Sequence, residues 1–581
     1  MIKTLSRCIR EYRRPTIITM SLIIFEVILE VLIPTRTADL INAIKAGVPV
    51  DRLLNDGLIL VVMAMLSLGC GAVAAYTSAR AASGFSANVR HDVFEKVQSF
   101  SFANIDKFST ASLVTRLTTD VTNVQFAFMM LIRAALRAPL MFLFSIIAAW
   151  RMAGVLALTF VVVVPVLIFS LLMIARKAMP AFRAVFKKYD RLNESVEENV
   201  RGMRVVKGFA REDYEKRKFA EASDNIRREF TKAERIVALN NPVMQFCMYF
   251  NMVFILLVGS RLVVSSGGEY IDVGQIQAML SYGFQILMSL MMLSMVYVML
   301  TFSAEAARRI CEVLNEQSAL ANPEEPLTEV ADGSVDFESV SFKYSEQAQR
   351  NALDSVDLHI RSGMTVGILG GTGSAKTTLV QLIPRLYDVT EGCVKVGGVD
   401  VRRYDLDTLR GAVSMVLQKN ELFSGTVAEN LRWGNENASD EELAEACRLA
   451  QADGFIRSFP DGYATHIEQG GTNVSGGQKQ RLCIARALLK KPKILILDDS
   501  TSAVDTRTDA LIRAGFRSYI PETTKIIIAQ RVASVEDADL ILVMENGRIV
   551  ERGTHETLMA SGGIYREIYE QQTRGGEAHE E

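Results

Sequence analysis

The hydrophobic positions of the chain gather before residue 301, in segments long and apolar enough to cross the hydrocarbon core of a bilayer, roughly 30 Å thick. Six such segments cover residues 16–33, 58–75, 134–149, 153–175, 242–264 and 276–301. An even number of crossings returns the chain to the side on which it started. The pattern therefore predicts an all-α, six-helix membrane domain over residues 1–315, surrounded by the lipid bilayer.

The connections between these segments differ strongly in length. Those after the second and fourth spans run for dozens of residues and alternate charged with apolar positions at helical spacing, which predicts long helical extensions into the cytosol. The second long connection and the N-terminus are rich in Lys and Arg, so this side and both termini are expected in the cytosol. The turns at residues 102–108 and 208–213 are the expected contacts with a soluble domain. Solvated hairpins with no coupling role are the alternative.

The rest of the chain has the composition of a soluble α/β domain. Pro323 and Pro326 break the helical pattern within a linker, residues 316–333. The soluble domain follows over residues 334–572, and the Gly- and Glu-rich residues 573–581 are expected to be disordered. The net charge of only −2 gives no overall field that would favour nucleic acid as a partner.

A glycine-rich turn follows a short buried-strand pattern, residues 365–369, and precedes a predicted helix. Its residues are Gly370, Gly371, Thr372, Gly373, Ser374, Ala375, Lys376, Thr377 and Thr378. Such a strand, turn and helix N-terminus direct backbone N–H groups at a phosphate. Lys376 is expected to reach the outer phosphates, and the Thr377 hydroxyl to bind Mg²⁺. Ala375 stands where the usual pattern has glycine, so its methyl group is expected to crowd the loop.

Two further motifs follow the phosphate loop. Residues 493–497 predict an apolar strand that ends in Asp498 and Asp499, which places one acid near a metal ion and the next near an attacking water. Before this strand, a second phosphate-binding turn is predicted at the start of a helix, residues 479–489, formed by Ser475, Gly476, Gly477 and Gln478. A chance glycine-rich turn could explain either turn alone, but the three motifs in this order are specific.

The order of these motifs resembles that of the nucleotide-binding domain of ATP-binding cassette (ABC) proteins. The motifs in this order are the phosphate loop, Gln418, residues 474–478, Asp498 with Asp499, residues 502–505 and Gln530. With six preceding spans and two long cytosolic connections, the whole chain is similar to the exporter branch of that family. The resemblance implies ATP and Mg²⁺ as cofactors, ATP hydrolysis coupled to export of a small molecule, and a place in the bacterial cytoplasmic membrane.

The resemblance also assigns roles to individual residues. It implies that Tyr344 stacks on adenine, that Thr377, Gln418 and Asp498 bind the metal, and that Asp505 belongs to the conserved loop after the acid pair. It further implies that two cassettes close head to tail. The signature residues Ser475, Gly476, Gly477 and Gln478 would then contact ATP bound to the partner's phosphate loop.

Besides Ala375, two further positions depart from the family pattern. The usual glutamate is Asp499 here, whose carboxylate is set back by one C–C bond, ~1.5 Å, and the usual histidine is Gln530, whose amide cannot carry a proton or positive charge as imidazole can. Since a displacement of ~1 Å can cost ~100-fold in rate, we expect a slow site built on Asp499 and Gln530, with Gln418 as a third catalytic residue. With its signature residues intact, the chain is similar to one subunit of heterodimeric multidrug exporters. The alternatives are a homodimeric exporter that tolerates both changes, and a regulatory or channel-type subunit that binds ATP without pumping.

The membrane half offers two candidate features of a substrate path. Glu26 and Glu30 share one helical face of the first span, where they either form a polar patch suited to cationic substrates or pair with Arg133 or Arg137. The sixth span is rich in flexible thioethers, which suit varied apolar ligands or simply pack against neighbours and lipid; among them are Met288, Met292 and Met295. We expect a hydrophobic or drug-like substrate, whose identity the sequence does not reveal.

Overall fold

The computed structural model describes residues 1–345, 348–500 and 502–577. The chain forms two compact units, the first from residues 1–98 and 110–316, and the second from residues 99–109 and 317–581. Residues 99–109, which the sequence assigns to the membrane domain, therefore pack with the soluble unit.

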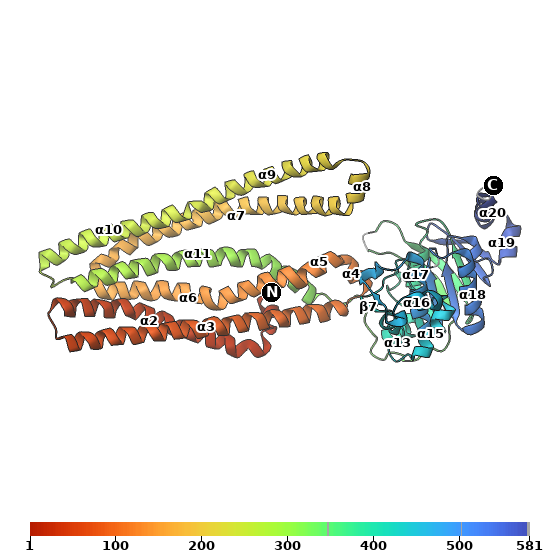
Figure 1. The fold of residues 1–581 in the computed structure, drawn as a ribbon, viewed down its shortest axis with the longest axis horizontal. Coiled ribbons are helices and arrows are strands. Elements are labelled where there is room, and N and C mark those ends of the chain that lie inside the picture. Colours follow the sequence, from red (N-terminus) through yellow and green to blue (C-terminus); the bar gives the residue numbers. More distant parts are fainter. Residues whose placement is uncertain (346–347, 501, 578–581) are drawn as a thin grey trace. The chain divides into compact units, whose positions relative to one another are not determined.

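The first unit is built of long helices (Figure 1). Its helices are α1 (Ile2–Arg7), α2 (Arg13–Lys45), α3 (Val50–Gln98), α5 (Thr110–Thr115), α6 (Val121–Ala153), α7 (Leu158–Arg201), α8 (Met203–Gly208), α9 (Glu212–Ala238), α10 (Asn240–Ser266) and α11 (Val273–Asn315), with short 3-10 helices at Arg10–Tyr12 and Gly154–Ala157 and a π-helical turn at Arg116–Asp120. At 1.5 Å per residue, the 49 residues of α3 and the 44 of α7 extend about 74 and 66 Å. Both exceed the hydrocarbon core, which confirms that membrane helices continue beyond the bilayer.

Five helical segments of the described chain are long and apolar enough to cross a membrane, where the sequence predicts six. They are Arg10–Lys45, Val50–Gln98, Thr110–Phe182, Glu212–Ser266 and Val273–Asn315. The difference arises in the third segment, which contains α6 and the first part of α7. The chain reverses direction between these two helices (Figure 1), because Gly154 leaves the helical conformation, with φ 16° and ψ −76°. This one segment therefore includes two of the predicted spans.

A proline in α2 shapes the contact between α2 and α11. Pro34 has no N–H, so the carbonyl of Glu30, four residues earlier, loses its helical donor. Gln285 of α11 replaces that donor, since its Nε2 donates to the Glu30 carbonyl at 3.1 Å. One turn away, the Tyr282 hydroxyl donates to the carbonyl of Val31 at 2.8 Å. In a bilayer every backbone group needs an internal partner, so these bonds fix α11 against α2.

The second unit contains two main sheets. Its strands are β1 (Val335–Phe342), β2 (Leu353–Ile360), β3 (Thr365–Leu369), β4 (Glu391–Val396), β5 (Val399–Asp400), β6 (Val413–Val416), β7 (Gly425–Thr426), β8 (His466–Ile467), β9 (Ile494–Asp498), β10 (Thr524–Ile528), β11 (Leu540–Glu545) and β12 (Arg548–Gly553). One sheet has the order β12-β11-β3-β10-β9-β6 and is parallel except for β12, while the other is antiparallel with the order β2-β1-β4-β5.

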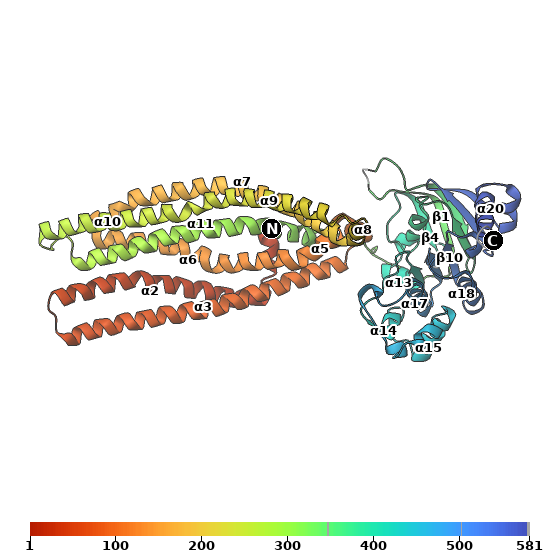
Figure 2. The same cartoon turned by 45° about the horizontal axis from the view of Figure 1, so that its top comes forward.

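Helices cover this mixed architecture (Figure 2). They are α12 (Lys376–Gln381), α13 (Leu406–Ala412), α14 (Val427–Arg432), α15 (Asp440–Leu449), α16 (Asp453–Ser458), α17 (Gly476–Leu489), α18 (Thr506–Tyr519), α19 (His555–Ser561) and α20 (Ile564–Glu577). Alternate residues of β9 enter two different cores: Leu495 and Leu497 pack in one with α17, while Ile494 and Ile496 pack in the other with β1. The parallel sheet is thus a buried central layer, which confirms the predicted α/β domain.

The helix α4 (Phe102–Phe108) belongs to this second unit. The Tyr387 hydroxyl donates to Asp106 at 2.7 Å, and the rings of Tyr387 and Phe102 lie 6.1 Å apart. Asn104 donates to the carbonyl of Gln317 at 3.0 Å. The predicted contact of residues 102–108 with the soluble domain is therefore confirmed, whereas a contact of residues 208–213 stays a prediction.

Helix α20 extends into the C-terminal residues, whose disorder stays a prediction. Helix α20 continues to Glu577, so residues 573–577 are helical, and residues 578–581 lie outside the described chain. The Thr573 hydroxyl donates to the carbonyl of Tyr569 at 2.9 Å, and Arg566 pairs with Glu570 at 2.7 Å. The ion pair between Arg566 and Glu570, four residues apart, favours the helical conformation of this segment.

Candidate functional site

Parallel strands bring the predicted nucleotide residues to one edge of the central sheet. Ile528 of β10 lies opposite Ile368 of β3 on one side and Asp498 of β9 on the other, so the three strands end together. The phosphate loop follows β3, and the acid pair follows β9. A cavity of 720 Å³ at this edge is lined by every predicted residue from Gly370 to Thr378 and by Tyr344, Gln418, Asp498, Asp499 and Gln530.

Asp498 and the side chains around it offer oxygen atoms that can serve as ligands for a metal ion. Asp498 is 2% exposed and accepts a hydrogen bond from the Thr377 hydroxyl at 2.8 Å. Burial raises the pKa of Asp498 above its ordinary value. Carboxylate, hydroxyl and amide oxygens are the ligands that Mg²⁺ prefers, so Thr377, Asp498 and Gln418 fit the ion that the sequence predicts.

Asp499 is held by the two amides that were predicted beside it. Gln530 Nε2 donates to Asp499 Oδ2 at 2.8 Å, and Gln418 Nε2 approaches the same oxygen at 3.4 Å. Both amides donate N–H to the carboxylate, but neither can accept a proton and become charged. Gln530 and Gln418 therefore both contact Asp499.

The loop itself closes around Lys376. Its ammonium donates to the carbonyls of Gly370 and Gly371 at 2.8 and 2.9 Å, and burial lowers its pKa. Ala375 has φ 72° and ψ 24°, a left-handed conformation that glycine adopts without strain. The expected consequence of alanine at this position is thus backbone strain as well as the bulk of the methyl group.

Tyr344 lies at the edge of the same cavity with an exposed ring, 51% accessible. Its hydroxyl hydrogen-bonds to that of Thr378 at 2.8 Å, and its ring lies 5.3 Å from that of Tyr387. The position allows an aromatic base to stack on the free face. The cavity also includes residues that sequence reasoning missed, among them Arg350, Asn351, Asn546 and Gly547. Asn546 and Gly547 form an Asn-Gly pair, which is a recognisable signal for a hairpin between β11 and β12. No sequence motif marks Arg350.

The signature residues occupy a different place from the phosphate loop. Ser475 is the N-cap of α17, and its hydroxyl accepts from the Gln478 N–H, while Gln478 Oε1 accepts from the Ser475 N–H. A Cβ on Gly477 would lie 2.8 Å from the carbonyl oxygen of Ala503, so this glycine is also required for packing inside the chain. Asp505 caps α18 by accepting from the Thr508 N–H at 2.9 Å. None of these residues lines the described nucleotide cavity.

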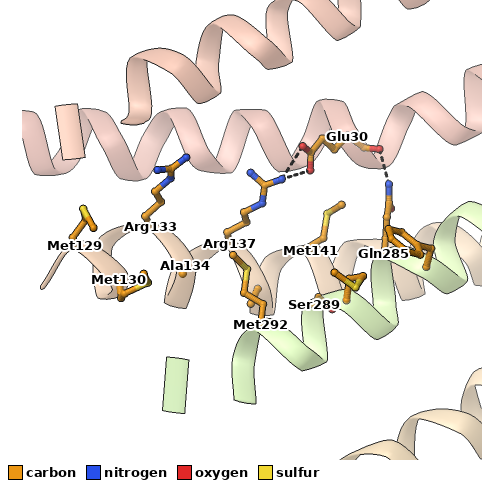
Figure 3. A pocket seen from close by; sticks show the side chains of 13 residues that line it. Glu30, Met129, Met130, Arg133, Ala134, Arg137, Met141, Gln285, Ser289 and Met292 are labelled. Atoms are coloured by element: carbon orange, nitrogen blue, oxygen red, sulfur yellow. Dashed lines mark hydrogen bonds and ion pairs between the residues drawn. The ribbon is translucent and has the colours of Figure 1, made fainter. Parts of the chain in front are cut away.

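The membrane unit contains a cavity of 640 Å³ between α2, α6 and α11 (Figure 3). Arg137 binds both predicted acids: its Nη1 donates to Glu26 at 2.6 Å, and its Nη2 donates to both oxygens of Glu30 at 2.8 Å. Of the two alternatives for these acids, pairing with Arg137 is therefore confirmed. Met288 and Met292 line the cavity, whereas Met295, about two turns beyond Met288, is not part of its lining.

Comparisons with known proteins agree with this architecture. Residues 16–299 match the ABC transporter transmembrane region, and residues 353–502 match the ABC transporter family model. An uncharacterized ABC transporter ATP-binding protein of Mycobacterium tuberculosis (strain CDC 1551 / Oshkosh) is 36% identical over 573 residues, which are 98% of this chain and 97% of that protein. The uncharacterized ABC transporter ATP-binding protein YfiB of Bacillus subtilis (strain 168) is 37% identical over 516 residues, 89% of each chain.

The fold is also similar to that of a solved structure. A bacterial Atm1-family ABC exporter with ATP bound has a TM-score of 0.83 and 24% identity, with 97% of this chain and 98% of that chain covered. A phosphate-binding α/β unit joined to long membrane helices defines an ATP-driven membrane transporter. The chain belongs to the ABC transporter family, its fold is that of an ABC exporter, and its ATP-binding domain implies ATP hydrolysis coupled to transport of an unidentified substrate.

Proposed function

We propose that this chain is one subunit of a heterodimeric exporter in the bacterial cytoplasmic membrane, with both termini in the cytosol and a hydrophobic or drug-like small molecule as substrate. The observation that carries the proposal is the 2.8 Å contact from Gln530 Nε2 to Asp499 Oδ2. It places an amide that cannot take up a proton against a carboxylate that is one methylene short.

Thr377, Asp498 and Gln418 would hold Mg²⁺, which, when bound, neutralises charge on phosphate oxygens. The chain's own residues then divide the remaining work. Lys376 and the loop bind phosphate, Tyr344 orients adenine, and Asp499 accepts a hydrogen bond from water. The carboxylate of Asp499 is misplaced for efficient catalysis, so the site retains ATP and hydrolyses it slowly.

The intact signature gives the chain a second role. Ser475, Gly476, Gly477 and Gln478 would contact the ATP that a partner's phosphate loop holds, and Asp505 would lie at the same dimer contact. A partner with a complete catalytic pair then supplies the fast site. This arrangement explains why two catalytic departures coexist with an unaltered signature.

Co-purification tests the heterodimer. Affinity isolation of the tagged chain from native membranes should bring a second six-span cassette chain that carries glutamate and histidine where this chain has Asp499 and Gln530. Uphill, ATP-dependent flux in sealed vesicles should require both chains. A stable, transport-active homodimer of this chain alone would contradict the proposal, and downhill flux alone would favour a channel.

Substitutions in the two phosphate motifs provide a second test. Gly476→Val should nearly abolish steady-state hydrolysis by the pair, because it blocks close approach to the partner's ATP, whereas Lys376→Ala should cost much less. Gly476 is a cleaner target than Gly477, since an added Cβ lies at an ordinary 3.6 Å from Ala503. Gly454→Val, on the open surface of α16, is the matched control. Equal losses from the first two variants would overturn the assignment of slow and fast sites.

A further inference from the structure

The charged lining of the membrane cavity is unbalanced. Glu30, Arg133 and Arg137 line it, and because both Glu30 and the neighbouring Glu26 pair with Arg137, Arg133 is the lining charge without an acid partner among the described residues. Glu26 is 8% exposed and does not line the cavity. Its carboxylate instead lies against α3, where a Cβ added to Gly71 would be 3.0 Å from Glu26 Oε1.

The two arginines of the cavity differ in their partners. Arg137 is engaged by both acids, and both oxygens of Glu30 accept from it at 2.8 Å. Arg133, four residues earlier on the same face of α6, is exposed and forms no hydrogen bond or ion pair within the described residues (Figure 3). The side chain of Arg133 lies beside that of Arg137, about 6 Å further along the helix.

Apart from Gln285 and Ser289, the remaining walls of the cavity are apolar and adaptable. They carry Met129, Met130, Met141, Met288 and Met292, beside the ring of Phe284. Thioethers adapt to apolar groups of varied shape, and a volume of 640 Å³ lies in the range of small-molecule sites. The cavity therefore combines a guanidinium that has no partner among the described residues with a deformable apolar surface.

We propose that this cavity selects amphipathic anions, with the anionic head group bound by Arg133 and the apolar tail against the methionines. The proposal rests on the export function and names its substrate class. A cationic ligand is disfavoured because Glu30, the only acid in the lining of the described cavity, is already paired, and removing its partner would leave buried charge uncompensated. This reverses the expectation of cationic substrates that two acids in the first span suggest.

Three probes with the same chain length test the selectivity: tetradecanoate, tetradecan-1-ol and tetradecyltrimethylammonium. Binding of radiolabelled tetradecanoate to the full-length protein is measured by scintillation proximity in phosphatidylcholine nanodiscs without nucleotide, with empty nanodiscs subtracted, and the other two probes compete. The native protein should prefer the anion. Equal or better competition by the cation would overturn the proposal.

Variants at Arg133 locate the selectivity. Arg133→Gln should weaken tetradecanoate binding about tenfold to one-hundredfold, the worth of a charged hydrogen bond, and leave tetradecan-1-ol unchanged. Arg133→Lys should retain the preference for the anion, and Arg133→Glu should transfer it to the cation. Arg36→Gln, on α2 and outside the cavity lining, is the matched control and should behave as native. An equal loss for all three probes in Arg133→Gln, or loss of the anion preference in Arg133→Lys, would refute the role of this charge.

The binding assay and the export function can fail separately. Charge-selective binding without ATP-driven accumulation of tetradecanoate in vesicles would support the site and overturn the export proposal. ATP-driven export of a neutral amphiphile, with binding that ignores Arg133, would support export and overturn the selectivity.

Discussion

The sharpest prediction concerns a gain of activity at Asp499. Asp499→Glu extends the carboxylate by one C–C bond, ~1.5 Å, into the 720 Å³ cavity that it already lines. The present carboxylate is held back by Gln530 at 2.8 Å and Gln418 at 3.4 Å. Because a displacement of ~1 Å costs ~100-fold in rate, restoring the reach should raise turnover by about 10- to 100-fold, or about 1.4–2.7 kcal/mol of activation free energy.

The assay is steady-state ATP hydrolysis at saturating Mg-ATP, on dimers that contain only this chain and are verified by cross-linking. A gain is informative because a misfolded variant cannot produce one. Asp499→Asn should abolish the residual rate, and Asp461→Glu, the same extension at an exposed position, should leave it unchanged. Adding Gln530→His to Asp499→Glu should raise the rate further. If Asp499→Glu binds ATP normally but hydrolyses it no faster than the native dimer, the length of this side chain does not limit the site.

Three further predictions concern strain, buried charge and coupling. Ala375→Gly relieves a left-handed alanine, φ 72°, by about 1 kcal/mol, so calorimetry should show the nucleotide-binding unit melting about 2–4 °C higher; a lower melting temperature would contradict the strain. Arg137→Met leaves Glu26 and Glu30 unpaired and should cost about 3–5 kcal/mol in detergent-unfolding experiments, whereas adding Glu26→Gln and Glu30→Gln should recover most of the loss. Replacing residues 208–213 with a flexible linker should preserve ATP affinity but abolish uphill flux, and unchanged flux would exclude a coupling role.

The features of this protein that depend on local pattern can be predicted from its sequence. Apolar length predicted the membrane helices, since a bilayer admits few other structures. Spacing within the chain identified the phosphate loop and the acid pair, because each motif is a short continuous segment whose chemistry depends on its own residues. The strand ends then had to meet, as parallel strands bring their carboxyl ends to one edge.

Contacts between segments far apart in the chain depend on how the chain folds and could not be predicted from the sequence. The sequence offered Arg133 and Arg137 equally as partners for Glu30, and packing of α2 on α6 selected Arg137. Likewise, nothing local marks Gln285 as the donor for the carbonyl that Pro34 leaves free. Local pattern reveals the periodicity of hydrophobic residues and the backbone preferences of each segment. Which distant residue becomes a side chain's partner depends on how the helices pack, because the distances between segments are set only when the chain folds.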